Sequence, residues 1–391
     1  MSTIKVINVQ NPSAASAAIT LDTNGQATLN GLAYPTSGSL SGRNRIINGD
    51  MRIDQRNAGA SISLANSNGY AVDRHLCFFQ GGATGTLTFQ RDSVAPAGFT
   101  NSIKATVVTA DTTNTQAYIA QFVEGYNVAD LNFGTANART VTLSFWVRSS
   151  IAGTYCGGIT GGGSSGNQVG YVFEYSISSA NTWEYKTVTI PGETSGTYVF
   201  DSTNGTGFRV KFDLGTIDPS RTAAPNAWTA GLKYSTTTAG VVRWKQNAGA
   251  TFYITGVQLE VGSVATPFER RSYGQELSLC QRYCQVHRVS SSGELIAVGV
   301  GNGATTSTQT LRPFVEFRST PSLDFNNSNN FQIQRVGAAT TQIPGSLNII
   351  SGSSNSKYIY IDCGISGGVA GEGQFLRSQN SSAVLILASE L

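Results

Sequence analysis

The chain has 391 residues, a net charge of +3 and only 13% charged residues. This length is more than one hydrophobic core usually organises, so we expect at least two domains. No Lys/Arg run and no apolar stretch of about 20 residues is present, which argues against nucleic-acid binding and membrane insertion. The first residues, MSTIKVINVQNPSA, lack the apolar core of a signal peptide, so we expect synthesis in a cytoplasm without Sec export.

The composition is typical of all-β proteins with many tight turns. The chain contains 44 Gly but only 2 His and 2 Met, and Ser, Thr and Asn are abundant. The number of cysteines is odd and no CxxC pair occurs, so we expect neither a disulfide framework nor a zinc site. The cysteines are Cys77, Cys156, Cys280, Cys284 and Cys363.

Residues 1–43 are predicted to form an arm. Apolar and polar residues alternate in IKVINVQ and in AITLDTNGQATLNGL, and Asn24-Gly25 is a strong turn signal between two short strands. Such a hairpin is too small to have a core of its own. We therefore expect it to dock on sister subunits or on another protein, with a disordered tail as the alternative.

Residues 44–271 are predicted to form an antiparallel jelly-roll β-sandwich. Many short apolar and β-branched segments follow one another with Gly, Ser, Asn and Thr turns and no helical pattern between them. The glycine-rich stretch 157–168 is expected to be a loop. It lacks the GK[ST] ending of a phosphate-binding loop. The predicted strands are Ile46-Ile47, Gly85–Gln90, Ser102–Val108, Ala117–Val123, Thr140–Val147, Gly170–Ser176, Tyr185–Ile190, Phe208–Phe212 and Ala250–Leu259.

Residues 272–288 are predicted to contain a short linking helix, Ser272–Val286. Ser272 is placed to be its N-cap, and Gln275 three residues later completes a capping-box pattern. Spacings of 4, 3 and 4 give one apolar stripe, which would pack on the adjacent sandwich or meet two other copies on a three-fold axis. The stripe consists of Tyr273, Leu277, Cys280 and Cys284.

Residues 289–391 are predicted to form a second, C-terminal β-sandwich. Pro313 and Pro321 favour strand starts or edges at those positions. The terminal segment SAVLILASEL is the most apolar one, so we expect a central strand or a subunit contact there. The predicted strands lie in LIAVGVG, TQTLRPFVEF, SLDFNN, FQIQRV, KYIYIDCGI and AVLILA.

Several motifs resemble the modules of bacteriophage tail-fibre and other virion-appendage proteins. They are NRIINGDMRIDQRNAG (44–59), YAVDRH (70–75), TLSFWVRSS (142–150), WEYKTVTIPG (183–192), the stretch 249–284 and LRPFVEFRSTPSLDF (311–325). The opening NGD, the SFWV strand and the closing ITGVQLE strand also resemble carbohydrate-binding modules of the jelly-roll kind. The chain departs from the pattern at His75, where the resemblance leads us to expect an aromatic residue.

The resemblance implies a non-enzymatic homotrimeric tail fibre in the virion. Residues 1–43 would attach it to a phage tail or capsid protein, and the β domains would present a surface to host polysaccharide. A head fibre or capsid decoration protein of the same fold is the alternative. A free carbohydrate-binding module is disfavoured because the chain has an arm and no signal peptide.

Exposed aromatic residues are the sequence's candidates for glycan contact, since sugars bind flat aromatic faces beside hydrogen-bonding groups. Packing in the core is the alternative for each of them, and Trp228 is the one most expected to be exposed. Trp146, Tyr171, Phe173 and Tyr175 are expected in the core. The glycan candidates are Trp183, Tyr185, Trp228, Tyr234 and Trp244.

Two further kinds of site are considered. The resemblance to carbohydrate-binding modules implies a structural calcium near the first and last strands, and Asn48, Asp50 and Glu260 would supply oxygen ligands there. A pair of carboxylates across a cleft would instead indicate a glycan-degrading enzyme. The acids considered for that chemistry are Asp50, Asp54 and Asp73, although Asp73 is more readily explained by a local ion pair with Arg74.

Overall fold

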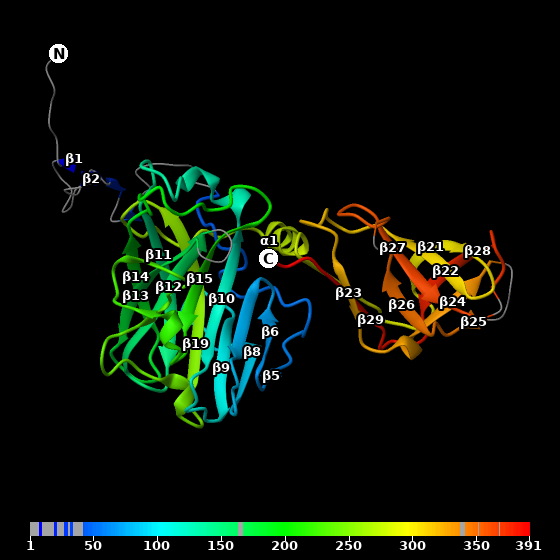
Figure 1. The fold of residues 1–391 in the computed structure, drawn as a ribbon, viewed down its shortest axis with the longest axis horizontal. Helices are drawn as coiled ribbons and strands as arrows, with labels where there is room; N and C mark the ends of the chain where they lie inside the picture. Colours follow the sequence, from blue (N-terminus) through cyan, green and yellow to red (C-terminus); the bar gives the residue numbers. More distant parts are fainter. Residues whose placement is uncertain are drawn as a thin grey trace, which may run out of the picture. The chain divides into compact units, whose positions relative to one another are not determined.

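The computed structural model describes residues 8–9, 19–21, 27–29, 32–33, 42–162, 167–336, 341–350, 352–366 and 368–391. Contacts divide the chain into two compact units, residues 1–271 and 272–390. The division falls where the sequence suggested that the jelly roll ends. Each unit is described by itself. Both are built from antiparallel sheets, and the protein is all-β apart from one α-helix and short 3-10 turns in the described residues (Figure 1).

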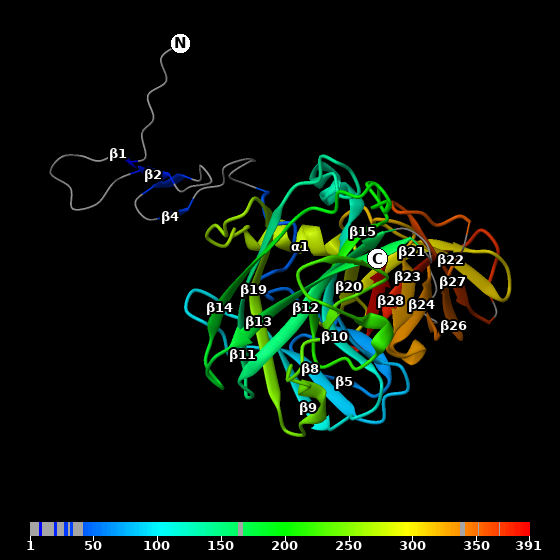
Figure 2. The same cartoon turned by 60° about the vertical axis from the view of Figure 1, so that its left-hand side comes forward.

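The first unit is a sandwich of two large sheets (Figure 2). One sheet has the spatial order β17 (Trp228–Ala230), β13 (Gln168–Ile177), β12 (Gly153–Gly162), β15 (Thr206–Asp213), β10 (Gln116–Glu124), β7 (His75–Gln80) and β6 (Ser67–Val72). The other has the order β14 (Glu184–Ile190), β11 (Val141–Ser149), β19 (Thr251–Val261), β9 (Ser102–Thr109), β8 (Thr86–Asp92) and β5 (Ile62–Leu64). A small parallel pair, β16 (Thr222–Ala223) and β18 (Ser235–Thr236), completes the unit. Its 3-10 turns are η1 (Gly125–Asn127), η2 (Ala129–Leu131), η3 (Pro219–Arg221) and η4 (Trp244–Gln246).

The path of the chain gives this sandwich its jelly-roll topology. From β9 onward the long strands pass from one sheet to the other: β9 and β11 lie in one layer, β10 and β12 in the facing layer. Alternating side chains fill the space between the layers, as expected when successive residues of a strand point to opposite faces. Phe145 and Phe212 come from opposite sheets and meet edge to face, with ring centroids 4.9 Å apart. The predicted jelly roll is confirmed.

Two predictions about this unit were wrong in detail. Ile46-Ile47 is not a strand, although both residues are buried. The expected glycine-rich loop is largely the second half of β12. Gly157 is required there because a Cβ atom would approach the Phe173 ring to 2.7 Å and the Lys211 carbonyl oxygen to 2.3 Å. The glycines of β12 therefore permit close strand packing, and residues 163–166 of the predicted loop lie outside the described part.

Only short pieces of the arm are described. They form a four-stranded antiparallel arrangement of β1 (Asn8–Val9), β2 (Ile19–Leu21), β3 (Ala27–Leu29) and β4 (Leu32–Ala33). β2 and β3 pair as the sequence suggested, with Ile19 opposite Leu29. The expected Asn24-Gly25 turn lies outside the described residues, and the docking partner of the arm stays a prediction.

The second unit begins with the helix α1 (Tyr273–Gln281). Ser272 is its N-cap, since its hydroxyl accepts a hydrogen bond from the Gln275 amide at 3.3 Å. The helix is shorter than predicted because the chain turns after Arg282 and enters β20 (Cys284–Arg288), which pairs with the last strand. No described helix is long and apolar enough to cross a membrane.

The predicted apolar stripe on the helix is therefore broken up. Tyr273 is 58% exposed and Leu277 is half-buried. Cys280 and Cys284 are fully buried, and Cys284 belongs to a strand. The proposal that these two cysteines face sister subunits is corrected on that ground: side chains already buried within the chain are not available for an interface. All five cysteines of the chain are buried.

Two sheets form the rest of the second unit. The smaller has the order β20, β29 (Val384–Ala388) and β23 (Ser322–Phe325), so the apolar terminal segment is a central strand as predicted. The larger has the order β25 (Thr341–Gln342), β24 (Phe331–Arg335), β28 (Gly373–Ser378), β21 (Leu295–Gly301), β22 (Thr306–Leu311), β27 (Ile359–Gly364) and β26 (Ser346–Ile349). A 3-10 turn, η5 (Ser328–Asn330), precedes β24, and Leu376, Leu385 and Leu387 lie in the shared core.

His75, where the resemblance to virion-appendage modules led us to expect an aromatic residue, lies inside the first unit. Its Nδ1 atom is 3.3 Å from the Asp73 carbonyl oxygen and its Nε2 atom is 3.4 Å from the Gln121 amide nitrogen. Burial lowers the pKa of His75 from 6.5 to about 3. The ring is therefore neutral in the folded protein over the whole range in which an unfolded His would take up a proton.

This burial predicts acid sensitivity of the first unit. Below about pH 6.5 the unfolded state binds a proton at His75, whereas the folded state binds it only near pH 3. The free energy of unfolding therefore falls as the pH falls through this range, by up to about 1.4 kcal/mol per pH unit. All 4 Trp residues lie in this unit, so denaturant unfolding followed by Trp fluorescence reports on it. Between pH 6.5 and 5, the free energy of unfolding of His75→Gln should fall by about 1.6 kcal/mol less than that of the wild type. Equal losses would contradict the assignment.

Candidate functional site

The candidate site lies on the outer face of the six-stranded sheet of the first unit. On β11, Phe145 and Val147 are fully buried in the core, whereas the intervening Trp146 is half-exposed on the opposite face. Tyr185 on the neighbouring strand β14 stands directly opposite Trp146 in the register. These two rings line one side of a groove with a volume of about 540 Å³.

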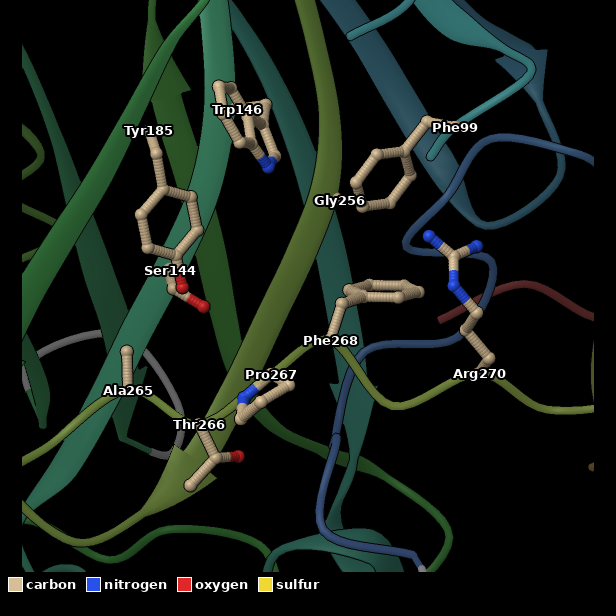
Figure 3. A pocket seen from close by; sticks show the side chains of 10 residues that line it. All are labelled: Phe99, Ser144, Trp146, Tyr185, Gly256, Ala265, Thr266, Pro267, Phe268 and Arg270. Atoms are coloured by element: carbon tan, nitrogen blue, oxygen red, sulfur yellow. The ribbon is translucent and has the colours of Figure 1, made fainter. Parts of the chain in front are cut away.

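Four aromatic side chains surround the groove (Figure 3). The rings of Trp146 and Tyr185 lie 5.4 Å apart and are tilted by 47°. On the other side of the strand that carries Gly256, Phe99 and Phe268 meet edge to face at 5.2 Å. The guanidinium group of Arg270 lies 4.8 Å from the centre of the Phe99 ring. The groove therefore combines aromatic faces with a charged group at one end.

Gly256 allows these two pairs of rings to approach each other. Its φ of +62° is a conformation that residues with a Cβ atom rarely adopt. It lies at a bulge, where the register between β11 and β19 shifts between Ser144 and Trp146. A Cβ atom at Gly256 would lie 2.8 Å from Phe99 and 3.1 Å from Trp146. The floor of the groove is therefore bare backbone at Gly256, because both the positive φ and the neighbouring rings exclude a side chain there.

The wall of the groove is a segment that folds back after β19. Thr266 donates two hydrogen bonds to the buried Glu260 carboxylate, from its amide at 2.8 Å and from its hydroxyl at 2.6 Å. The Gln258 side chain donates to Glu260 at 2.8 Å and accepts from the Glu269 amide at 2.7 Å. Residues 266–269 are therefore fixed on the outer face, which places Phe268 beside the groove.

The same segment is tied to the beginning of the unit. The Glu269 carboxylate accepts a hydrogen bond from the Asn44 amide at 2.7 Å, and Arg271 donates to the Ile46 carbonyl oxygen at 3.1 Å. Arg43 donates to the Pro267 carbonyl oxygen at 2.6 Å. The first and last segments of the jelly roll therefore hold each other, and the groove wall is part of that contact.

Polar groups are available inside the groove. The Tyr185 hydroxyl is hydrogen-bonded to Ser144, and burial raises the pKa of Tyr185, so the hydroxyl is protonated near neutral pH. The indole nitrogen of Trp146 points into the groove, and no described residue accepts a hydrogen bond from it (Figure 3). These donors lie at the edges of the aromatic faces, where they can reach the hydroxyl groups of a bound molecule.

The structure separates the predicted glycan residues from one another. Tyr185 lines the groove, but Trp183 does not: its ring contacts Tyr253 edge to face at 6.1 Å. Trp228, which we expected to be the most exposed, is half-buried. Its indole nitrogen donates to the Pro191 carbonyl oxygen at 2.9 Å, and its ring packs against Phe133 at 5.8 Å. Trp228 therefore closes an edge of the sandwich.

Tyr234 and Trp244 are fully buried, and their predicted contact with a glycan was wrong. The Tyr234 hydroxyl donates to the Gln116 side chain at 2.8 Å, and its ring meets Tyr118 at 5.1 Å. Trp244 lies in the main core against Phe252 at 6.4 Å. A ring without exposed surface offers no face to a sugar.

Sequence reasoning missed Trp146, Phe99, Phe268 and Arg270 as residues of the site. The strand pattern did carry a signal for Trp146, because Phe145 and Trp146 are adjacent and cannot both face one core. Nothing local marked Phe99 or Phe268. They come together only because the chain returns over β19, through contacts between residues far apart in the sequence.

Most of the oxygens predicted to bind calcium have other partners, whereas Asp50 Oδ1 is buried and accepts no hydrogen bond from a described residue. Asn48 accepts from the Ile53 amide at 2.9 Å and donates to the Ile53 and Asp73 carbonyl oxygens. Asp50 pairs with Arg52, and Glu260 is held by Thr266 as described. In the part of the chain that the structure describes, no group of three or more His, Cys, Asp or Glu side chains could hold a metal ion. Asn48 and Glu260 therefore act as structural hydrogen-bonding residues, and Asp50 acts as the ion-pair partner of Arg52.

The acids considered for glycan cleavage also have structural partners. Asp54 accepts from the Asn57 amide at 2.9 Å and from the Gly59 amide at 2.6 Å, which fixes the turn before β5. Asp73 accepts from the Gln55 amide at 3.0 Å. None of these acids lines the groove.

Comparison with known proteins gives only distant likenesses. No protein-family model and no curated protein matches the chain. The chain is similar to the enzymatically active domain of tailspike protein 4 of bacteriophage CBA120, with a TM-score of 0.30 and 15% identity over 59% of this chain and 24% of that chain. It is also similar to a family 11 carbohydrate-binding module from Clostridium thermocellum (TM-score 0.27, 13% identity, 54% of this chain and 99% of the module). A putative sugar-binding protein from Bacteroides thetaiotaomicron is similar with a TM-score of 0.28 and 13% sequence identity. The match covers 56% of this chain and 100% of that protein. These TM-scores are too low to assign a function, which must be inferred from the groove itself.

Gly256→Ala tests how the groove floor is built. Both the positive φ and the contacts with Phe99 and Trp146 oppose a Cβ atom, so we expect the free energy of unfolding to fall by about 2–4 kcal/mol. Denaturant unfolding monitored by Trp fluorescence measures this change. Gly240→Ala is the matched control, because Gly240 has a φ of +77° but no atom within 4 Å of the added Cβ. It should cost only about 1 kcal/mol. Equal costs would show that the rings do not crowd Gly256.

Proposed function

We propose that this chain is a non-enzymatic glycan-binding protein of a phage particle, and that the groove over β11, β14 and β19 is its glycan site. The observation that carries this proposal is the set of four aromatic side chains around bare backbone on an outer sheet face. Outer faces of antiparallel sheets normally carry polar residues. A partly exposed cluster of aromatic rings on such a face is therefore best explained by a ligand that covers it.

A sugar is the ligand class that fits this groove best. Sugar rings have apolar C–H faces that pack on aromatic rings and hydroxyl edges that need hydrogen-bonding partners. Trp146 and Tyr185 supply both, since each carries a donor at the edge of its ring. The mixture of one charged group and several aromatic faces is also typical of small-molecule sites.

The wider context of the proposal comes from the sequence motifs. We propose a homotrimeric tail fibre whose arm, residues 1–43, attaches it to the virion and whose β domains adsorb to host-surface polysaccharide. Three chains per fibre would raise the apparent affinity of a weak site through multivalency. A head fibre or capsid decoration protein would use the same groove from a different position on the particle.

Replacing either ring of the first pair should weaken glycan binding. Trp146→Ala and Tyr185→Ala each remove roughly 1.5–3 kcal/mol of apolar contact, which corresponds to about a 10- to 100-fold loss of affinity. Binding would be measured against an array of bacterial surface polysaccharides and then by calorimetry on the best ligand. Tyr126→Ala is the control, because Tyr126 is 62% exposed but does not line the groove.

Wild-type affinity in both groove variants would refute the site. Loss of affinity in the Tyr126 variant as well would indicate a general surface effect. Release of reducing ends from the bound polysaccharide, abolished by Asp54→Asn, would instead support the glycan-degrading alternative.

The trimer makes a separate prediction. Light scattering after size exclusion should give about 124 kDa for three chains of 41.2 kDa each. A single chain of 41.2 kDa at micromolar concentration would contradict self-assembly of the isolated protein and favour a monomeric binding module.

A further inference from the structure

A second small cavity lies in the C-terminal unit, and its lining differs from that of the groove. Its volume is about 250 Å³. It is formed by the loop that follows β22 and the loop that precedes β27. The lining residues are Arg312, Pro313, Phe314, Glu316, Lys357 and Tyr358. The size suits a single ring of a saccharide better than a drug-sized ligand.

The first loop is held in place by one buried side chain. Gln285 on β20 accepts a hydrogen bond from the Phe314 amide at 2.8 Å and donates to the Val315 carbonyl oxygen at 2.6 Å. Both hydrogen-bonding ends of its amide are thus used on the backbone of this loop. The position of Phe314 is fixed before any ligand arrives, which lowers the entropic cost of binding.

The two loops are also fixed to each other. The Phe317 amide donates to the Ser356 carbonyl oxygen at 3.0 Å, and the Ser356 hydroxyl donates to the Glu316 carboxylate at 2.9 Å. The Lys357 ammonium group lies 3.8 Å from the same carboxylate. Residues from both loops therefore keep a constant spacing around the cavity.

Two aromatic rings are exposed at the cavity although the loops that carry them are ordered. Phe314 is 61% exposed and Tyr358 is 44% exposed. Phe314 stacks on His287, with ring centroids 4.7 Å apart and planes inclined by 30°. Burial lowers the pKa of His287 to about 4, so this ring is neutral near pH 7 and supports Phe314 without adding charge. An apolar ring that is backed by a second ring and otherwise exposed is a platform for stacking.

The charges of the cavity favour an anion. Glu316 is paired with Lys357, whereas Arg312 makes no ion pair or hydrogen bond with any described residue. The cavity therefore has one positive charge in excess, on a planar guanidinium group that matches a carboxylate with two parallel hydrogen bonds. Aromatic platforms beside a free guanidinium group fit a sugar ring that carries a carboxylate.

We propose that this cavity is a second glycan site, specific for an acidic sugar residue. Phe314 and Tyr358 would pack on the sugar ring, Arg312 would bind its carboxylate, and the Lys357–Glu316 pair would hydrogen-bond its hydroxyl groups. This inference extends the proposed function to the second unit. It does not depend on the groove, which has different residues in a different unit.

Calorimetry on the full-length protein tests the proposal with two acidic probes, trigalacturonic acid and a sialic-acid trimer. At least one should bind, and its methyl ester, which lacks the charge, should bind about 10-fold or more weakly. Arg312→Gln and Phe314→Ala should each weaken binding of the acid by about 10- to 100-fold. Trp146→Ala, which damages only the groove, should leave it unchanged.

Several outcomes would overturn the proposal. They are no binding of either acid, equal binding of acid and methyl ester, or wild-type affinity in both cavity variants. Melting curves for the variants verify that each is folded, and both changed side chains are exposed. If Trp146→Ala abolished binding of the acid and Arg312→Gln did not, the acidic sugar would belong to the groove. That result would support the proposed function and refute this second site.

Discussion

The buried carboxylate of Glu260 is the interaction on which the groove of the first unit depends. A carboxylate that is only 1% exposed is costly unless its oxygens are fully hydrogen-bonded. Thr266 and Gln258 supply those hydrogen bonds. They also bend the chain back over β19 at the place where a plain sandwich would expose the sheet. One satisfied charge therefore fixes the wall of the groove, and the ties from Asn44 and Arg43 connect this wall to the beginning of the unit.

The second constraint is the bulge at Gly256. A regular strand would place a side chain in the centre of the outer face and separate Trp146 from Phe99. The bulge and the missing Cβ atom leave the backbone at Gly256 bare. The Trp146–Tyr185 pair lies on one side of this strand and the Phe99–Phe268 pair on the other (Figure 3). Fold and site are thus coupled: the jelly roll supplies a rigid sheet, and two local departures from regularity convert one face of it into a groove.

The sequence predicted the regular parts of the structure well. The long strands β9, β10, β11, β13 and β19 are rich in apolar and β-branched or aromatic residues and are separated by clear turns, so their positions and the jelly-roll class could be predicted from the sequence. The prediction was less good where tertiary contacts override local pattern. The helix was expected to reach Val286, but pairing with the last strand converts residues from Cys284 onward into β20. The glycines of β12 suggested a loop, although they serve close strand packing.

The site was harder to predict than the fold, and the reason is physical. Exposure of an aromatic ring depends on what covers it, and covering segments come from distant parts of the chain. Trp244 and Tyr234 look like loop residues but are buried, whereas Trp146 looks like a core residue and faces outward. Tyr185 is the one predicted glycan residue that lines the groove, since it alternates along β14 with residues that face the other way. The return segment that carries Phe268 left no local signal that could be recognised.

A crystal structure of the full-length chain with an oligosaccharide from the polysaccharide that it binds best would test the central claim most directly. We expect sugar rings packed against Trp146 and Tyr185, above the bare backbone of Gly256 and beside Phe268. A sugar bound elsewhere on the first unit, with the groove unoccupied, would contradict the claim that the bulge and the return segment build the glycan site.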